Sequence, residues 1–218
     1  MIGSILAAVT ATAPATAPVP PNPCQPAESC RYVEGFSLHD NQGNPHPLRI
    51  GQWLTFVVDG RLSLFPGEVV TVDLSKATPV VTDYSVISDA DREKALESVV
   101  TQQNAQSAAA GQEMLRSAPV AKSPLFDAPP GSLRIAFVQA AGRADMILRI
   151  SNGFDRALIY KATILVPGRT SATLTTACPL RPSRPGVEGW PMPIYRIDLS
   201  DLTLGQPGAS APALQNCK

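Results

Sequence analysis

The stretch Asp145-Met146-Ile147-Leu148-Arg149-Ile150-Ser151 decides the fold of this chain, because its side chains alternate in character. The even positions are apolar and the odd ones, apart from Ile147, are polar. This period of two predicts a β-strand with one buried face. Asn152-Gly153 follows, a dipeptide that tolerates tight turns, and residues 157–166 then alternate again. The pattern therefore predicts a hairpin of two strands.

The stretch that follows this hairpin is interrupted by prolines. Residues 170–178 predict a strand in which Leu174 and Cys178 share one face. Residues 179–193 contain five prolines and therefore cannot form a central strand. We expect them to form a loop.

The last alternating stretch changes its parity. Tyr195, Ile197 and Leu199 are apolar at every second position, but the apolar positions beyond Ser200-Asp201 are Leu202 and Leu204. A shift by one residue predicts a β-bulge or a corner at this point.

The N-terminal half is also β in pattern. Asp59-Gly60 is typical of a tight hairpin turn, and residues 39–47 form a polar turn. We expect the sheet that partners residues 145–204 to come from this half. Its predicted strands cover residues 32–38, 52–58, 61–64, 70–74 and 80–87.

One segment between the two β halves has a different period. Ser88-Asp89-Ala90-Asp91 is typical of a helix start, and the acids lie where they stabilise the positive end of a helix. We expect a helix over about residues 89–117, within an insertion at 88–118. Its middle carries few large apolar side chains, so it either lies across the sandwich, anchored by its ends, or forms a mobile arm that binds a partner.

The N-terminus resembles an export signal. Residues 1–9 form a short apolar run, and residues 10–18 contain the small residues of a cleavage site. Against this interpretation, no Lys or Arg precedes Arg31, and Pro follows both candidate sites. A start codon further upstream would explain the missing basic residues. The run is far shorter than the ~20 apolar residues of a membrane span.

These patterns predict the domain organisation. We expect residues 1–30 to be an export signal and a Pro-rich linker, which places the protein in the periplasm or outside the cell. Residues 31–205 would form a single β-sandwich domain, and residues 206–218 a C-terminal tail tied by a disulfide.

Four cysteines, Cys24, Cys30, Cys178 and Cys217, allow two disulfides in three possible pairings. We favour Cys24 with Cys30, which lie in a Pro-rich approach to the first predicted strand, and Cys178 with Cys217, of which the first ends a predicted strand and the second lies one residue from the terminus. Four free thiols are the alternative. No CxxC pair or Cys/His cluster indicates zinc, and no cofactor is expected.

The composition excludes some classes of partner. Lys plus Arg and Asp plus Glu both number 18, so the formal net charge is zero, and no long basic or acidic run occurs. Nucleic acid and anionic membrane surfaces are therefore not expected as partners. The 22 prolines and the low charged fraction of 17% are typical of a turn-rich β protein.

Motifs for catalysis are absent from the sequence, which contains no GxSxG, HExxH, Walker or GxGxxG pattern. The two histidines, His39 and His46, share a loop with Asp40 that could in principle hold a metal ion. Their spacing matches no established site, and solvated loop histidines are the simpler interpretation. We assign no catalytic residue and no metal ligand.

One stretch is typical of a binding surface. Residues 181–191 carry Arg181, Arg184 and Trp190 on a chain stiffened by prolines, which offers planar donors and a stacking face to a glycan or a protein. The alternative is that Trp190 packs into the edge of the sandwich. Trp53 opens a predicted strand and is expected in the core or at its edge.

Three short motifs in residues 145–204 carry a family resemblance: Ser151-Asn152-Gly153-Phe154-Asp155-Arg156-Ala157-Leu158-Ile159-Tyr160-Lys161-Ala162, Thr176-Ala177-Cys178-Pro179 and Glu188-Gly189-Trp190-Pro191. In these motifs the chain resembles uncharacterised exported proteins of alphaproteobacteria. The resemblance implies export and an all-β domain. It implies no activity and no functional residue.

Together these features predict a mainly β protein, an immunoglobulin-like antiparallel β-sandwich with one inserted α-helix. The expected function is non-catalytic, with a binding or structural role in the bacterial cell envelope and an envelope protein or a glycan as partner. One alternative is a carbohydrate-binding module that uses Trp190, Trp53 and nearby arginines, in which case Trp190→Ala would abolish glycan retention without lowering the melting temperature. Another is a hydrolase whose carboxylates converge only in the fold.

Overall fold

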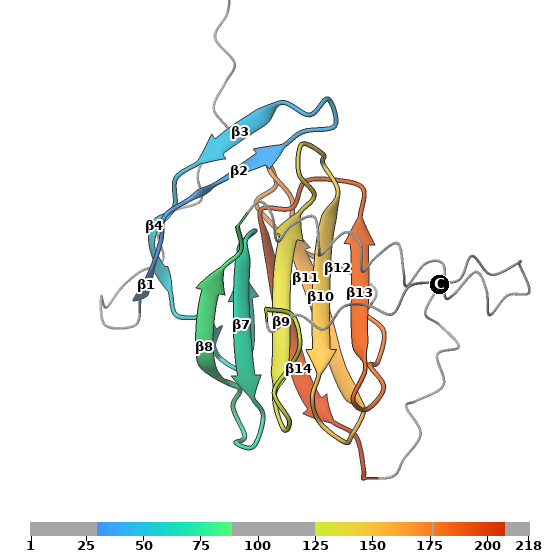
Figure 1. The fold of residues 1–218 in the computed structure, drawn as a ribbon. Helices are drawn as coiled ribbons and strands as arrows, with labels where there is room; N and C mark the ends of the chain where they lie inside the picture. Colours follow the sequence, from blue (N-terminus) through green and yellow to red (C-terminus); the bar gives the residue numbers. More distant parts are fainter. Residues whose placement is uncertain (1–29, 89–124, 176, 208–218) are drawn as a thin grey trace, which may run out of the picture.

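The computed structural model describes residues 30–88, 125–175 and 177–207, and within them the protein is mainly β (Figure 1). The strands in chain order are β1 (Cys30–Val33), β2 (Phe36–His39), β3 (Pro45–Leu48), β4 (Gly51–Leu54), β5 (Val57–Val58), β6 (Arg61–Leu64), β7 (Glu68–Asp73), β8 (Val80–Val86), β9 (Leu133–Gln139), β10 (Met146–Asn152), β11 (Leu158–Leu165), β12 (Thr173–Thr175), β13 (Pro185–Trp190) and β14 (Arg196–Leu204).

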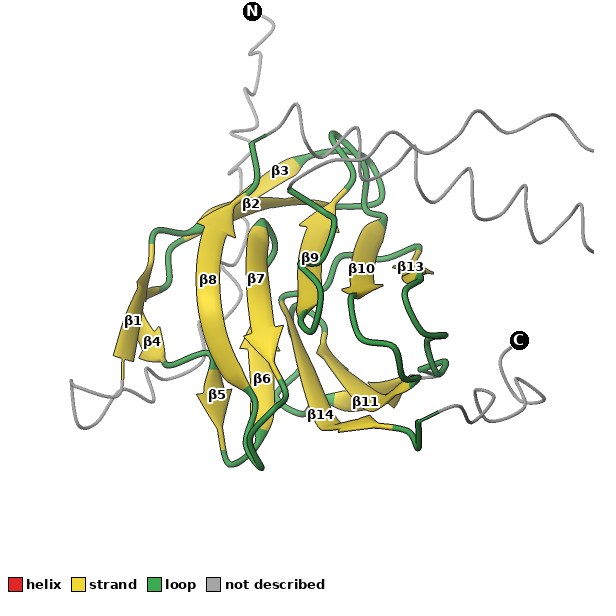
Figure 2. Cartoon of the chain, turned by 60° about the horizontal axis from the view of Figure 1, so that its bottom comes forward, coloured by secondary structure: helices red, strands yellow, loops and turns green. Residues whose placement is uncertain are grey.

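Two five-stranded antiparallel sheets form the body of the fold, as the predicted sandwich requires. The first sheet has the order β13-β10-β9-β7-β8 and the second has the order β12-β11-β14-β6-β5. Figure 2 shows the two layers facing each other. Each sheet draws strands from both halves of the chain, so the prediction that the N-terminal half supplies one sheet was wrong. From the N-terminal half, β7 and β8 belong to the first sheet and β5 and β6 to the second. From the C-terminal half, β9, β10 and β13 belong to the first sheet and β11, β12 and β14 to the second.

The predicted hairpin around Asn152-Gly153 was also wrong. β10 pairs with β9 and β13, whereas β11 pairs with β12 and β14, so the chain crosses between the sheets at this point. The Asn152 side chain holds the crossover, since its Oδ1 accepts from the Phe154 amide at 3.0 Å and its Nδ2 donates to the carbonyls of Arg156 and Arg181. An Asn-Gly pair can therefore serve a crossover as well as a hairpin.

Gly153 is required at this crossover by close approach of another segment. Its amide donates to the Ser132 carbonyl and its carbonyl accepts from the Gly131 amide, both at 2.9 Å. A Cβ added at Gly153 would lie 2.8 Å from the Ser132 oxygen and closer still to the Pro129 oxygen. Only glycine lets the two backbones run this close together.

Two small ribbons flank the sheets. The single strand predicted over residues 32–38 is broken into β1 and β2 at Gly35, which has a φ of 116°. β1 pairs with β4, and β2 pairs with β3, which arises within the predicted polar turn 39–47. Figure 1 shows the β2–β3 ribbon across one end of the sandwich and the β1–β4 ribbon beside β8.

Two local predictions are confirmed. Asp59 and Gly60 both have positive φ, 51° and 73°, as a tight turn between β5 and β6 requires. Ser200 lies opposite Lys161 and Thr203 opposite Ile159, so β14 has one residue more than β11 between these pairs. Asp201 takes a φ of 54° in this bulge, which explains the parity shift.

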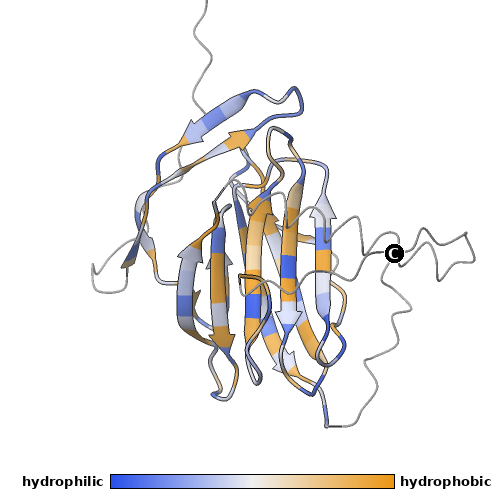
Figure 3. Ribbon diagram, in the orientation of Figure 1, coloured by the Kyte–Doolittle hydropathy of each residue, from blue (hydrophilic) through white to orange (hydrophobic). Residues whose placement is uncertain are grey.

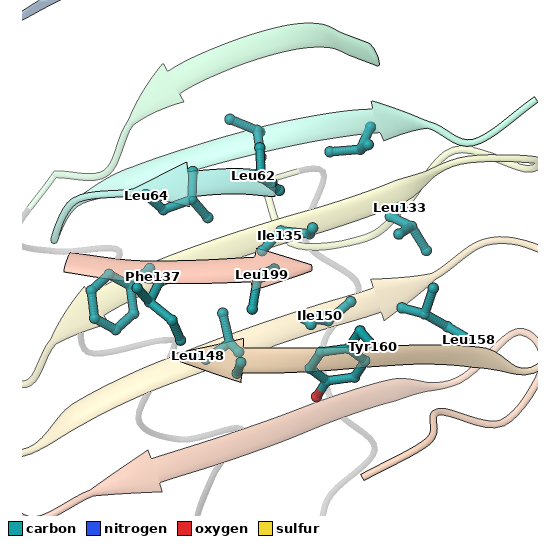
Figure 4. Close-up of a cluster of buried hydrophobic side chains, with 14 of the residues drawn as sticks. Leu62, Leu64, Leu133, Ile135, Phe137, Leu148, Ile150, Leu158, Tyr160 and Leu199 are labelled. Carbon is teal, nitrogen blue, oxygen red and sulfur yellow. The ribbon is translucent and has the colours of Figure 1, made fainter. Parts of the chain in front are cut away.

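The main core lies between the two sheets (Figure 4). It is built from the apolar side chains that face inward from both sheets. Because inward-facing positions recur at every second residue of a strand, the period of two predicted the strands correctly. Its residues include Leu62, Leu64, Leu133, Ile135, Phe137, Leu148, Ile150, Leu158, Tyr160 and Leu199.

Two inner strands of the first sheet, β9 and β10, are buried on both faces, which corrects the prediction of a strand with one buried face. Every residue of β9 and β10 is buried, and apolar residues run along both strands in Figure 3. The outer face carries a second cluster that contains Val69, Ala136, Ile147 and, from the segment after the gap in the described chain, Phe126. Ile147, the exception to the alternation, packs in this cluster.

The Pro-rich region and the strand before it also differ from the prediction. Leu174 is 64% exposed, so its face of β12 is not the core. Residues 185–190 of the predicted loop form β13, which occupies the edge of the first sheet. An edge position tolerates Pro185 because one side of the strand needs no ladder partner.

Several predictions lie outside the described residues. These are the helix over residues 89–117, the export segment, and Cys24 and Cys217, so both disulfide pairings stay predictions. The described part of the chain contains no helix that is long and apolar enough to cross a membrane.

Gly153→Ala should destabilise the protein, because the new methyl group meets backbone oxygens that cannot move without breaking the crossover. We expect a loss of about 3 kcal/mol in the free energy of unfolding, as for severe overpacking, measured by denaturant titration. Gly189→Ala is the control, since its Cβ would lie 3.7 Å from the Met146 oxygen, an ordinary contact. Equal effects of the two changes would contradict the packing argument.

Candidate functional site

The two edges of the sandwich differ, and the difference locates the candidate site. At the edge formed by β13 and β12, side chains join the two sheets. Trp190 Nε1 on β13 donates to Thr175 Oγ1 on β12 at 3.0 Å, and Tyr160 on β11 donates to Glu188 Oε1 on β13 at 2.7 Å. This edge is therefore closed by hydrogen bonds between the sheets.

The residues predicted to form a binding surface lie at this closed edge. Arg181 and Arg184 are exposed, and their backbone carbonyls accept hydrogen bonds from Asn152. Trp190 is half-buried and packs against the main core. The structure thus favours the alternative in which Trp190 packs into the sandwich edge, and its replacement is expected to disturb that packing.

Trp53 is 5% exposed and offers no stacking face to a ligand. Its ring makes an edge contact with Phe65, with centroids 5.3 Å apart, and Arg196 stands over it. It belongs to a third apolar cluster, under the β1–β4 ribbon. The expectation that Trp53 is a packing residue is confirmed.

At the opposite edge, formed by β8 and β5, no side-chain hydrogen bond joins these two strands within the described residues. A groove of about 490 Å³ lies there, lined by Thr55 and Phe56 between β4 and β5, by Val57 of β5, and by residues 79–84 of β8 and the turn before it. Phe56 and Tyr84 form its aromatic part, with ring centroids 4.9 Å apart. Figure 2 shows β8 and β5 on the same side of the molecule, in different layers.

A buried ion pair positions the aromatic wall of this groove. Arg31 on β1 pairs with Glu68 on β7 and donates to the Ser63 carbonyl on β6 at 3.0 Å. Its guanidinium carbon lies 4.0 Å from the centre of the Phe56 ring, a cation–π contact. Arg31 thus links the β1–β4 ribbon to both sheets, and Phe56 contacts both Arg31 and Tyr84.

The electrostatics of the pair favour a structural role. Burial raises the pKa of Glu68, while the Arg31 charge and the Phe65 amide, which donates to Glu68 Oε2 at 2.8 Å, lower that pKa. With these two donors the carboxylate has partners on both oxygens. Burial, and then the Glu68 charge, raises the pKa of Tyr84, so its ring is neutral at physiological pH and can make apolar contacts.

β8 also presents backbone groups along the groove. Among the described strands it pairs only with β7. Thr82, Asp83 and Tyr84 are exposed, and Asp83, the single charged residue of the strand, pairs with Arg134 at 2.6 Å. An edge strand without free charges or an internal proline is open to pairing with another extended chain.

A second, polar cleft of about 300 Å³ lies between the β2–β3 turn and the β9–β10 turn. Buried Gln139 joins the two turns, since it exchanges hydrogen bonds with the backbone of His39 and donates to the Ala144 carbonyl. Asp40 and Asp145 line the cleft. Asp145 pairs with Arg143 at 2.6 Å.

The predicted histidine loop is part of this cleft region. His46 Nε2 lies 3.0 Å from Asp40 Oδ2, and hydrogen bonds from His46 and from Asn44 and Gln42 hold the pKa of Asp40 well below its usual range. Asp40 is therefore ionised at neutral pH and is unsuited to act as a general acid. In residues 30–88, 125–175 and 177–207, no group of three His, Cys, Asp or Glu side chains could hold a metal ion.

Sequence reasoning missed the groove. The sequence pattern predicts strands over residues 52–58 and 80–87 and gives Phe56 and Tyr84 no role. Nothing in the local pattern shows that these two segments lie in different sheets and come together at the same edge of the sandwich. A usable signal was present in residues 80–86, where only one of seven residues is charged. That composition is unusual for an exposed edge strand.

Comparison of the chain with family models, with curated proteins and with solved structures gives no match.

Glu188→Gln should make the stability of the closed edge less dependent on pH. Burial raises the pKa of Glu188, whose Oε2 is enclosed without a hydrogen-bond partner. A raised folded-state pKa means that the protein loses stability as pH rises above the unfolded pKa of about 4.3 and through the folded value. The melting temperature of the variant, relative to wild type, should therefore increase as the pH rises from about 4 through the folded pKa of Glu188.

Glu34→Gln is the matched control, because Glu34 is exposed and its removal leaves the closed edge intact. A difference between the Glu188 variant and wild type that stays constant across this pH range would contradict the assignment.

Proposed function

We propose that this protein is a non-catalytic binding protein of the bacterial cell envelope, exported to the periplasm or beyond, and that it binds an extended, largely apolar segment of a partner protein at the β8–β5 edge. The observation that carries the proposal is the asymmetry of the sandwich. One edge is bridged by Trp190, Glu188 and Tyr160, while the other combines an apolar groove with an edge strand whose second side is open within the described chain.

Strand addition explains why groove and edge strand occur together. An added strand takes main-chain hydrogen bonds from the edge of a sheet and places alternate side chains in neighbouring pockets. Here β8 supplies the main-chain groups and the groove beside Phe56 and Tyr84 supplies the pocket. The ligand side chains that enter it would be apolar or aromatic, since the groove is walled mainly by Val, Pro, Phe and Tyr.

The compartment and the finer fold description belong to the same proposal. Export is supported by the apolar N-terminal run, and the paired disulfides Cys24–Cys30 and Cys178–Cys217 would suit an oxidising compartment. An immunoglobulin-like arrangement is supported by the two five-stranded antiparallel sheets that face each other.

Tyr84→Lys should abolish binding of seven-residue peptides, the length of β8, from a synthetic array in which apolar and polar residues alternate. The ring is 41% exposed, so its loss should remove the pocket wall and add a charge with little change in melting temperature. Binding of the labelled full chain to the array is the measurement.

Leu174→Lys is the matched control. Leu174 is an exposed apolar residue on β12, an edge strand remote from the groove in the sheet order, so this variant should bind as wild type does. Equal losses in the two variants, or retention of binding by Tyr84→Lys, would remove the groove as the site.

A further inference from the structure

Two neighbouring arginines on the outer face of the first sheet have very different surroundings. Arg134 on β9 is 8% exposed, and Arg149 on β10 is 4% exposed. They lie on the same face, since Arg134 is opposite Ser151 and Arg149 is opposite Ala136 in the register of the two strands. Both are cations removed from water, and each therefore needs partners to offset the cost of burial.

Arg134 has its partners. Its Nε donates to the Leu125 carbonyl at 3.0 Å, and a terminal nitrogen donates to Thr71 Oγ1 at 2.5 Å and to Asp83 Oδ2 at 2.6 Å. These contacts tie β7, β8 and the segment that precedes β9 to one side chain. Arg134 is fully explained as a structural residue.

Arg149 is not explained in this way. Its Nε is enclosed without a hydrogen-bond partner, and the Asp127 carboxylate lies 3.6 Å from Nη2, beyond hydrogen-bond distance. Its guanidinium carbon stands 4.8 Å from the centre of the Phe126 ring. Burial lowers the pKa of Arg149, as expected for a cation with too little compensation, although arginine stays charged.

Ser151 adds a second unsatisfied donor on the same face. It is 6% exposed, and its Oγ also is enclosed without a partner. Residues two apart on one strand point the same way, so Ser151 and Arg149 share the outer face of β10. Buried polar groups almost always have a partner, and two adjacent exceptions indicate a ligand that completes them.

We propose that Arg149 and Ser151 form a binding site for a hydrogen phosphate group, either free phosphate or a phosphomonoester. Arg149 supplies Nε and a terminal nitrogen, and Ser151 supplies its hydroxyl, which suits an anion with three or more oxygens better than a carboxylate with two. Asp127 does not exclude this ligand, because a hydrogen phosphate donates its own hydroxyl to a neighbouring carboxylate. The side chain of Asp127 is 44% exposed, so the Asp127 side of the site borders solvent.

This site is independent of the proposed groove. It lies on the outer face of the first sheet, over β10 and β9, whereas the groove lies at the edge of β8 that no described strand pairs with. Loss of one function therefore leaves the other testable.

The test is the melting temperature of the full chain with inorganic phosphate added against chloride at equal ionic strength. At ten times the dissociation constant the wild type should gain roughly 3 to 6 °C. Arg149→Met should lose this gain while being as stable as wild type, or more stable, in chloride, because it removes a buried charge whose Nε has no hydrogen-bond partner. Ser151→Ala should bind phosphate more weakly, and it keeps the test valid if Arg149→Met does not fold.

Arg134→Met is the matched control. It should lower the melting temperature in chloride, because it breaks three hydrogen bonds, and yet keep a phosphate-dependent gain. Glycerol phosphate in place of phosphate distinguishes a free anion from a phosphomonoester: a larger gain assigns the latter, and a gain with phosphate alone assigns the former. A wild type that does not respond to phosphate, or equal responses in wild type, Arg149→Met and Ser151→Ala, overturns the proposal.

Discussion

Burial of both faces of β9 and β10 is the constraint on which the rest of the structure depends. Their inner faces form the core against the second sheet, and their outer faces pack against Phe126 and its neighbours. A sheet buried on both sides must be covered on both, so the second sheet and the segment before β9 are equally necessary to it. Polar side chains on these strands are shielded from solvent and therefore need hydrogen-bond partners within the protein.

Buried polar side chains in this fold act as connectors between elements. Glu68 joins the β1–β4 ribbon to the first sheet through Arg31, Gln139 joins two turns, and Asn152 holds the crossover from one sheet to the other. Each connector takes several hydrogen bonds, so its removal would leave donors or acceptors without partners. Arg149 and Ser151 differ from these residues, and this difference is the reason to assign them a ligand.

One edge of the sandwich is bridged by hydrogen bonds and the other carries a groove, and this difference follows from the lengths and amino-acid compositions of the edge strands. On one side β13 carries Glu188 and Trp190, whose polar atoms reach the second sheet and close the gap. On the other side β8 carries Val, Thr and Tyr, and its partner layer ends in the short strand β5. In the described residues the Thr82 and Asp83 side chains of β8 bond to β7 and β9 within their own sheet, and an apolar groove lies between the layers at this edge.

The sequence by itself determined the class of structure, most strand positions, the turn at Asp59-Gly60 and the bulge after Ser200, because these depend on local side-chain alternation and on backbone conformations that few residues adopt. It also placed Trp53 among packing residues. It did not determine which strands pair, since the crossover at Gly153 and the edge position of β13 depend on contacts between segments far apart in the chain. Tertiary structure alone brought Phe56 beside Tyr84 and enclosed Arg149 Nε without a hydrogen-bond partner, because proximity and burial are properties of the assembled sheets and leave no mark in the local pattern.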